Sequence, residues 1–315
     1  MNSIDIVAVT SRSFSKNPVL RKELLSRYQN VKFNDDGQLL EGDSLVSFLQ
    51  GSTKAITALE KMTYRVLNSL PHLSVISKYG VGLDMIDQNA MRQLGKRLGW
   101  TGGVNKRSVS ELVVCFAIAM LRNIPAANRG VIDGVWRQHI GSLLSHKTVG
   151  IIGCGFIGKD LVQLLKAFQC SIIVNDIVNY HDFYLNNNIE AVSLDKLLAE
   201  ADIVTLHVPL NDSTYKMLDE SRLAIMKHGS ILINAARGDL VDELALKSKL
   251  MDRSLSAAAF DVFSIEPPQD QELLELPNFL STPHIGGSSM EAILAMGRAA
   301  IDGLDNHCIP PHDIS

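Results

Sequence analysis

Cysteines are few in this chain of 315 residues, and neither sign of charge dominates it. The four cysteines form no C-x-x-C pair and no zinc-ligand spacing, so we expect no metal site and a reduced, cytoplasmic setting. A net charge of −4 gives no reason to expect nucleic acid or an anionic membrane as a partner. The longest apolar run, 112–121, is too short to span a bilayer, and the N-terminus is no signal peptide.

What the chain does contain is a glycine motif at a predicted strand-to-helix turn. The apolar run 148–152 predicts a buried strand, and 161–168 has helical periodicity. In such a motif the first glycine makes the turn, the second lets a pyrophosphate approach, and the third lets helix and strand pack. The phosphates would lie at the positive end of the helix. The motif reads Gly153-Cys154-Gly155-Phe156-Ile157-Gly158.

A carboxylate follows the motif at the spacing that a dinucleotide site requires. The run 171–174 predicts a second strand, and Asp176 stands 18 residues past Gly158 (176 − 158). There it would meet the ribose hydroxyls and repel a 2′-phosphate, which favours NAD over NADP. The alternative is a glycine-rich turn that binds no nucleotide. Cys154 is interpreted as a small filler in the loop and not as a reactive thiol.

Strand and helix patterns alternate along the chain, which implies parallel sheets with helices on both faces. The predicted strands are 4–9, 55–58, 73–78, 148–152, 171–174, 201–208, 230–234, 256–261 and 279–281, and the predicted helices are 19–28, 64–70, 88–94, 161–168, 221–226, 242–251 and 291–305. We expect two α/β domains, Rossmann-like or flavodoxin-like, with an interdomain cleft. The predicted division is 1–104 for the first part of a substrate domain, 105–284 for the NAD-binding domain, and 285–315 for a C-terminal helix returning to the substrate domain.

One predicted helix, 112–121, is apolar nearly all round and should be buried on every side. Ser108 and Glu111 have the spacing of a capping box at its start. The helix is either an interdomain core helix or also part of a dimer interface, and both alternatives stay open. Trp136 is expected to be a buried core residue, with the alternative that it reaches the cleft.

Residues capable of acid–base chemistry follow the last predicted strands. Arg237 follows 230–234, Asp261 ends 256–261 with Glu266 shortly after, and His284 follows 279–281. Taken singly, Arg237 could form a surface ion pair, Glu266 could be a solvated loop residue, and His284 could be a turn residue. Together, at the carboxyl ends of successive strands in a nucleotide-binding fold, they indicate a base and a cation beside the cofactor.

Seven ordered motifs resemble those of the D-isomer-specific 2-hydroxyacid dehydrogenases, particularly the phosphoglycerate dehydrogenase-like branch. The resemblance covers about 78–292. The motifs are the glycine motif together with Lys78-Tyr79-Gly80-Val81-Gly82-Leu83-Asp84, 105–112, His207-Val208-Pro209-Leu210, 233–238, 260–267 and Thr282-Pro283-His284-Ile285-Gly286-Gly287.

The resemblance implies a role for each matching residue. His284 would be the general acid/base, and Glu266 would hold its imidazolium, since a neighbouring carboxylate favours that form. Arg237 would bind the substrate carboxylate with its planar fork. Asp261 would hold the nicotinamide carboxamide. The substrate-binding residues implied are Tyr79, Gly80, Val81, Gly82 and Arg237, and the cofactor-binding residues implied are Gly153, Gly155, Phe156, Ile157, Gly158, Asp176, His207, Pro209, Ala235, Asp261, His284 and Gly286.

The implied function is hydride transfer between NAD and a small D-2-hydroxy acid or 2-keto acid, by a homodimer formed through the NAD-binding domain. A first alternative is a D-3-phosphoglycerate dehydrogenase proper. Thr57-Ala58 weaken it, because they stand where many of those enzymes carry Arg-Ser for the distal phosphate. An alternative of another class is an NADH-sensing, corepressor-like binding protein.

Overall fold

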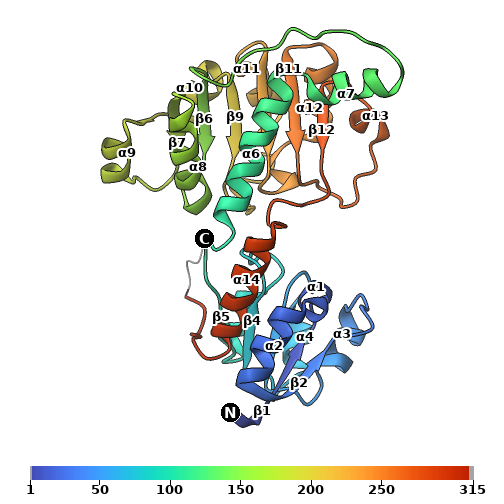
Figure 1. Cartoon of the computed structure of the whole chain (residues 1–315). Coiled ribbons are helices and arrows are strands. Elements are labelled where there is room, and N and C mark those ends of the chain that lie inside the picture. Colours follow the sequence, from blue (N-terminus) through green and yellow to red (C-terminus); the bar gives the residue numbers. More distant parts are fainter. Residues whose placement is uncertain (1, 312–315) are drawn as a thin grey trace. The chain divides into compact units, whose positions relative to one another are not determined.

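The structure, a computed structural model, describes residues 2–311. The chain divides into two compact units (Figure 1). Unit 1 comprises Met1–Asn105 and Ser289–Ser315, and unit 2 comprises Lys106–Ser288. Each unit has its own parallel sheet, so the predicted α/β class is confirmed.

Unit 1 is built on a five-stranded parallel sheet in the order β2-β1-β3-β4-β5. This is the flavodoxin-like strand order, in which the chain direction across the sheet reverses between β1 and β3. The strands are β1 (Asn2–Val9), β2 (Tyr28–Phe33), β3 (Lys54–Thr57), β4 (Val75–Lys78) and β5 (Arg97–Gly99). The helices are α1 (Arg12–Lys16), α2 (Pro18–Arg27), α3 (Gly42–Leu49), α4 (Tyr64–Asn68), α5 (Gln88–Gln93) and α14 (Met290–Gly303).

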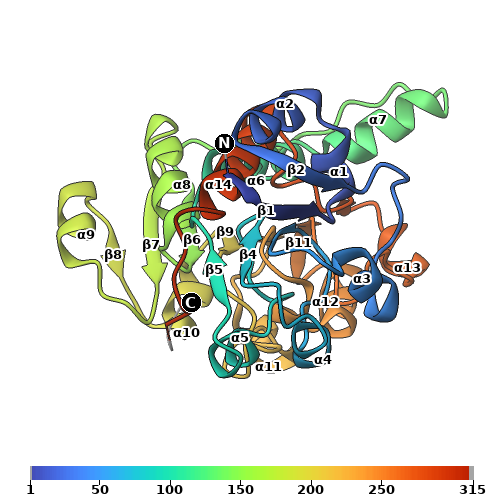
Figure 2. The same ribbon diagram turned by 90° about the horizontal axis from the view of Figure 1, so that it is seen from below.

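Two apolar clusters cover the two faces of this sheet. Helices α3, α4 and α5 supply one cluster, and α1, α2 and α14 supply the other. Figure 2 shows these two groups of helices on opposite sides of the strands. The C-terminal helix α14 is tied down by Ser77, whose hydroxyl donates to the Ala300 carbonyl at 2.6 Å, and by Arg298, which pairs with Glu23 of α2 at 2.8 Å. The last helix therefore completes the core that the first residues of the chain begin.

Unit 2 has a seven-stranded parallel sheet in the order β12-β11-β10-β9-β6-β7-β8. The strands are β6 (Thr148–Ile152), β7 (Ser171–Asn175), β8 (Glu190–Ala191), β9 (Ile203–Leu206), β10 (Ser230–Asn234), β11 (Leu255–Phe260) and β12 (Phe279–Ser281). The helices are α6 (Lys106–Leu121), α7 (Ile124–Ile132), α8 (Phe156–Ala167), α9 (His181–Asn187), α10 (Leu194–Glu200), α11 (Glu220–Ile225), α12 (Glu243–Met251) and α13 (Gln271–Leu274), with a 3₁₀ turn η1 (Gly238–Leu240). This is the Rossmann order, which reverses between β6 and β9.

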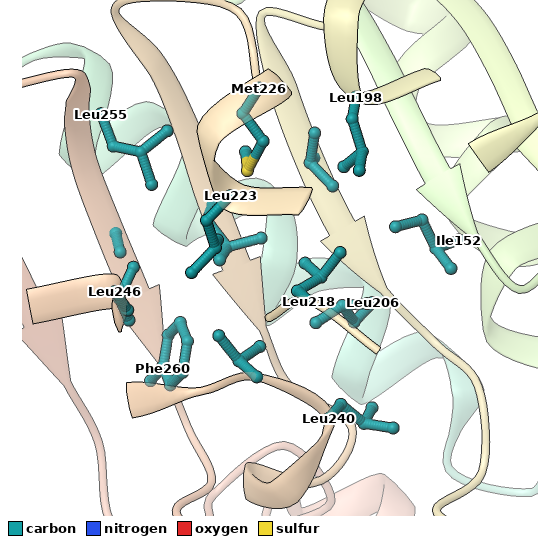
Figure 3. Close-up of a cluster of buried hydrophobic side chains, with 14 of the residues drawn as sticks. Ile152, Leu198, Leu206, Leu218, Leu223, Met226, Leu240, Leu246, Leu255 and Phe260 are labelled. Atoms are coloured by element: carbon teal, nitrogen blue, oxygen red, sulfur yellow. The ribbon is translucent and has the colours of Figure 1, made fainter. Parts of the chain in front are cut away.

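The sheet of unit 2 is also buried on both faces. Figure 3 shows one face, where Leu198 of α10, Leu223 of α11 and Leu246 of α12 pack with the strand residues Leu206 and Phe260. Helices α6 and α8 pack on the other face. Because both faces are covered, the functional groups of this unit can gather only at the ends of the strands.

Three local expectations from the sequence are wrong. Helix α6 begins at Lys106, so Ser108 lies inside its first turn and no capping box forms there. The helix packs on the sheet along one face and leaves Cys115 exposed, so it is not buried on every side in this chain. Trp136 is 88% exposed, because the segment after α7 runs along the surface without packing beneath a helix or strand.

Among the described residues, no single helix has the length and apolar character needed to cross a membrane. Helices α6 and α7 meet that criterion only when taken together, and the chain bends by 64° between them.

Candidate active site

The glycine loop of unit 2 lies where its strand order reverses. Gly153 has a φ of +95°, which permits the sharp turn after β6, and a Cβ there would lie 2.7 Å from the His207 carbonyl carbon. A Cβ on Gly158 would lie 2.3 Å from the Gly153 oxygen, so the start of α8 packs directly on the loop. A Cβ on Gly155 would meet nothing within 4 Å. Gly153 and Gly158 are thus required for close packing, whereas Gly155 faces open space.

That open space fits the phosphates of a dinucleotide. Gly155 is the N-cap of the twelve-residue helix α8 and supplies no capping side chain. The first N–H groups of a helix lack intrahelical partners and carry partial positive charge, so they bind phosphate. Phe156 and Ile157 form the first turn that would carry these groups. The residues present therefore fit the cofactor that the motif predicts.

Asp176 lies beside the glycine loop, just past β7. Its two carboxylate oxygens accept hydrogen bonds from the backbone N–H of Cys154 at 2.5 Å and of Val178 at 2.8 Å. Burial and the nearby Asp176 charge raise the pKa of the Cys154 thiol to about 11. Cys154 is therefore a buried, protonated thiol, as expected of a filler residue.

His207 follows β9 on the other side of the reversal point. Its Nε2 lies 3.0 Å from the Thr205 hydroxyl, while Nδ1 is buried and has no partner among the described residues. Burial lowers the pKa of His207 to about 3, so the imidazole is neutral at any ordinary pH. Pro209, which is exposed, and Ala235, which is half-buried and follows β10, lie at the ends of the neighbouring strands.

His284 and Glu266 form a pair at the end of β12. The imidazole Nδ1 of His284 lies 2.9 Å from Oε2 and 3.2 Å from Oε1 of Glu266. Both side chains are accessible, with 46% and 41% of their surface exposed. Glu266 also accepts the Phe263 N–H at 3.1 Å. Because Nδ1 is occupied by the carboxylate, the exchangeable proton at this site belongs to Nε2.

Asp261 holds the segment that carries His284. The carboxylate is buried, and it accepts hydrogen bonds from the Thr282 hydroxyl at 2.5 Å and from the N–H groups of Ile285 and Gly286 at 2.7 Å each. The His284 N–H donates to the Asp261 carbonyl at 2.9 Å, and His284 itself has a φ of +55°. Asp261 therefore fixes the backbone on both sides of the histidine, a role that the sequence did not reveal.

Arg237 is positioned by close packing of two loops. The next residue, Gly238, would carry a Cβ only 1.9 Å from the Phe263 carbonyl carbon, so no larger residue allows this approach. Asn234 donates to the Arg237 carbonyl at 2.8 Å. Glu243 accepts both the N–H and the hydroxyl of Ser264 at 2.8 and 3.0 Å. These structural roles of Gly238 and Glu243 were not predicted from the sequence, although Gly238 directly follows Arg237.

The remaining predicted residues lie in unit 1, after β4. The Tyr79 N–H donates to the Thr57 carbonyl at 2.8 Å and continues the ladder, and Gly80 then turns with a φ of +123°. In the part of the chain that the structure describes, the N–H groups of Gly80, Val81 and Gly82 donate no hydrogen bond. Successive N–H groups without partners can bind an anion such as a carboxylate, so this turn has the chemistry of an anion site.

The described residues contain no group of three or more His, Cys, Asp or Glu side chains that could hold a metal ion. Unit 2 carries the His284–Glu266 pair and the Arg237 guanidinium in the segments that follow its strands β10, β11 and β12.

Comparisons with known proteins identify the relatives of this chain. Residues 114–286 match the family model for the NAD-binding domain of D-isomer-specific 2-hydroxyacid dehydrogenases. The chain is 34% identical over 264 residues to the hydroxypyruvate reductase of Thermotoga maritima, covering 82% of this chain and 85% of the relative. It is 35% identical over 249 residues to the D-3-phosphoglycerate dehydrogenase of Archaeoglobus fulgidus, covering 78% of this chain but only 47% of that longer relative.

Among solved structures, the D-lactate dehydrogenase of Aquifex aeolicus, complexed with NAD and lactic acid, matches with a TM-score of 0.82. The identity is 23%, and the match covers 95% of this chain and 93% of that one, so it shows the shared fold. The chain belongs to the D-isomer-specific 2-hydroxyacid dehydrogenase family. It is an oxidoreductase of the NAD-binding type, which confirms the resemblance found in the motifs.

Proposed function

We propose that this dehydrogenase transfers a hydride between NAD and a small D-2-hydroxy acid or 2-keto acid, with His284, Glu266 and Arg237 as its catalytic residues. The 2.9 Å contact between His284 Nδ1 and Glu266 carries the proposal, because it leaves Nε2 as an acid or base at the end of β12. The bound nicotinamide supplies or accepts the hydride. Asp176 favours NAD over NADP, since a 2′-phosphate beside its carboxylate would be repelled.

Residues of this chain transfer the proton and bind the substrate carboxylate. In the reducing direction, His284 donates the Nε2 proton to the carbonyl oxygen of the substrate as the carbonyl carbon receives the hydride, so the keto acid becomes a hydroxy acid. Glu266 then faces a neutral imidazole, which regains its proton from water. Arg237 and the N–H groups of Gly80–Gly82 bind the substrate carboxylate. Positioned acid–base catalysis of this kind contributes about 10²- to 10⁴-fold.

A D-3-phosphoglycerate dehydrogenase proper is the second candidate, supported by similarity to named enzymes of that activity. The unit 1 loop offers little to a distal phosphate. Thr57 is fully buried, and Ala58 has no polar side chain. An NADH-sensing, corepressor-like protein is the remaining alternative, and it would bind NADH without turning over any acid.

The deciding experiment follows NADH oxidation by absorbance with glyoxylate, hydroxypyruvate, pyruvate and 3-phosphohydroxypyruvate. Turnover of a small unphosphorylated acid supports the proposal, and clear preference for the phosphorylated acid supports the second candidate. NADH binding without turnover of any of these acids would contradict both enzyme assignments and favour the sensor.

We further propose that the chain forms a homodimer through the segment 124–143 of unit 2. Helix α7 has no buried residue, and the chain that follows it continues on the surface (Figure 1). Trp136 and Ile140 are 88% and 98% exposed. The other large apolar side chains exposed there are Ile124, Val131, Ile132, Val135 and Leu143. A short segment with this many exposed large apolar side chains is unusual on a monomer and is typical of an interaction site.

The dimer is tested by light scattering coupled to gel filtration. The mass measured by light scattering should be about twice the 34.5 kDa of one chain. Ile140→Glu should convert it to monomer, because a charge would be buried unpaired in the interface. Leu39→Glu, at an exposed apolar residue of unit 1, is the matched control and should leave the mass unchanged. A wild-type chain of monomeric mass would contradict the proposal.

A further inference from the structure

The carboxyl edge of the unit 1 sheet carries an acidic side chain at the point where its strand order reverses. In parallel α/β sheets, ligands bind outside the carboxyl ends of the strands at this reversal. In unit 1 it falls between β1 and β3. Thr10 follows β1, Ala58 follows β3, and Glu60 stands two residues further along. None of these residues belongs to the motifs by which the family is recognised.

Two hydrogen bonds to one carboxylate oxygen hold the Glu60 side chain between the ends of β1 and β3. Its Oε2 accepts the Thr10 hydroxyl at 2.8 Å and the Ala58 N–H at 2.7 Å. Thr10 is itself fully buried and also contacts the Ile56 carbonyl. The other oxygen, Oε1, has no partner among the described residues, and the side chain is only half-buried. Glu60 therefore presents one fixed, accessible hydrogen-bond acceptor.

This acceptor lies next to the loop proposed to hold the substrate carboxylate. Strand β3 pairs with β4, and the Tyr79 N–H donates to the Thr57 carbonyl. The Lys78 ammonium contacts the Ala58 carbonyl, and its Cε would lie 3.5 Å from a Cβ on Gly80. Adjacent strand ends are about 4.8 Å apart, which is comparable to the length of a three-carbon acid.

We propose that Glu60 determines which 2-keto acids this enzyme accepts. With the substrate carboxylate on the N–H groups of Gly80–Gly82, Oε1 accepts a hydrogen bond from a hydroxyl on the carbon beyond the keto group. The same oxygen repels a phosphate at that position. The substrate class is thus a small, unphosphorylated keto acid with a terminal hydroxyl. Because this assignment rests on the proposed function, its test must separate the two.

The test compares wild type with Glu60→Gln, since glutamine keeps an acceptor for Thr10 and Ala58 while removing the charge. Two ratios of kcat/KM with NADH are measured, so that a general loss of activity cancels. The hydroxypyruvate-to-pyruvate ratio should fall about fivefold, because a charge-assisted hydrogen bond is roughly twice as strong as a neutral one. The 3-phosphohydroxypyruvate-to-hydroxypyruvate ratio should rise about tenfold or more, since Lys78 remains as the nearby cation.

Two further variants separate charge from structure. Glu60→Asp keeps the charge, so phosphate should remain disfavoured as in the wild type. A rise like that of Glu60→Gln would overturn the proposal. Glu200→Gln, at the exposed last residue of α10, removes the same charge elsewhere and should leave both ratios and the activity unchanged.

The outcomes distinguish this inference from the proposed function. If wild type is active and Glu60→Gln moves neither ratio, Glu60 does not select the substrate, while the dehydrogenase assignment stands. If wild type binds NADH but reduces none of the acids, the proposed function fails and the selectivity proposal fails with it.

Discussion

The carboxyl edges of the two sheets are built differently. In unit 2 the reversal point is lined by backbone, because Gly153 and Gly158 allow chain segments to approach closely and Gly155 leaves open space. In unit 1 the corresponding point is occupied by a side chain, the Glu60 carboxylate bridging Thr10 and Ala58. Backbone N–H groups are the same whatever the residue, whereas a side chain can be exchanged by one mutation. We infer that ligand binding at the glycine loop of unit 2 depends little on side chains. Ligand binding at the unit 1 edge, in contrast, depends on the side chain of Glu60.

The largest effect is expected at the acid–base pair of unit 2. His284→Ala should lower kcat/KM by about 10²- to 10⁴-fold, because no other group replaces the Nε2 proton. NADH affinity, measured by fluorescence titration, should be nearly unchanged. His228→Ala, at an exposed histidine, serves as the control and should keep full activity. Substantial turnover by the His284 variant would remove this residue from the mechanism.

A second prediction separates the two kinds of glycine in the loop. Gly158→Ala should lower the free energy of unfolding by about 1–3 kcal/mol, since its Cβ would overlap the Gly153 oxygen. Gly155→Ala meets open space, so stability should change by less than about 0.5 kcal/mol. NADH affinity of Gly155→Ala should nevertheless fall about tenfold or more, because the methyl group would occupy the space of the pyrophosphate. Unchanged affinity would show that the phosphates bind elsewhere.

The third prediction concerns pH and His207, whose ring nitrogen Nδ1 is buried. An unfolded histidine titrates near about 6.5, whereas burial lowers the pKa of His207 to about 3 in the folded chain. Between these values the unfolded chain binds more protons. The stabilisation is therefore complete above about pH 6.5 and is lost progressively as the pH falls toward 3.

Urea unfolding of wild type and His207→Gln at a series of pH values measures this effect. The variant should show a flatter stability profile between about pH 6.5 and 3, since glutamine does not titrate. His228→Gln, at an exposed position, should retain the wild-type profile. A wild-type slope in His207→Gln would mean that another group causes the acid sensitivity.

The smallest effect is expected in unit 1, at one of the two donors to Glu60. Thr10→Val should lower the free energy of unfolding by about 1 kcal/mol, because one buried hydrogen bond is lost while the volume is kept. Since the charge of Glu60 remains, the preference against 3-phosphohydroxypyruvate should shift less than in Glu60→Gln. Thr10→Ser keeps the hydroxyl and should resemble wild type in both measurements. An equal shift in Thr10→Val and Glu60→Gln would indicate that geometry, and not charge, sets the selectivity.

Most strands and the longer helices were predictable, because their apolar residues recur with a clear period. Strand β10, for instance, is an unbroken buried run, and it was placed at its observed bounds. Strand β2 was missed, since Tyr28–Phe33 mixes polar and apolar residues without such a run. Helix α7 was missed for the opposite reason, because it packs on nothing and its apolar residues remain exposed.

The candidate site was predictable where a motif carries it. The glycine motif, Arg237, Glu266 and His284 could be named from the sequence, because each stands at a fixed distance after a recognisable strand. The hydrogen bonds of Asp261 and the close packing at Gly238 could not be predicted from the sequence, because they depend on loops that meet only after folding. Glu60 carries no motif, and its importance appears only when β1 and β3 lie side by side.

The sequence by itself determined the α/β class, the glycine loop and the candidate acid–base residues, because periodicity and short spacings are local properties of a chain. Only the tertiary structure decided that His284 is fixed through Asp261, that Trp136 is exposed, and that Thr10 and Glu60 meet. These features depend on strand order, which joins residues from distant parts of the chain at one edge of a sheet.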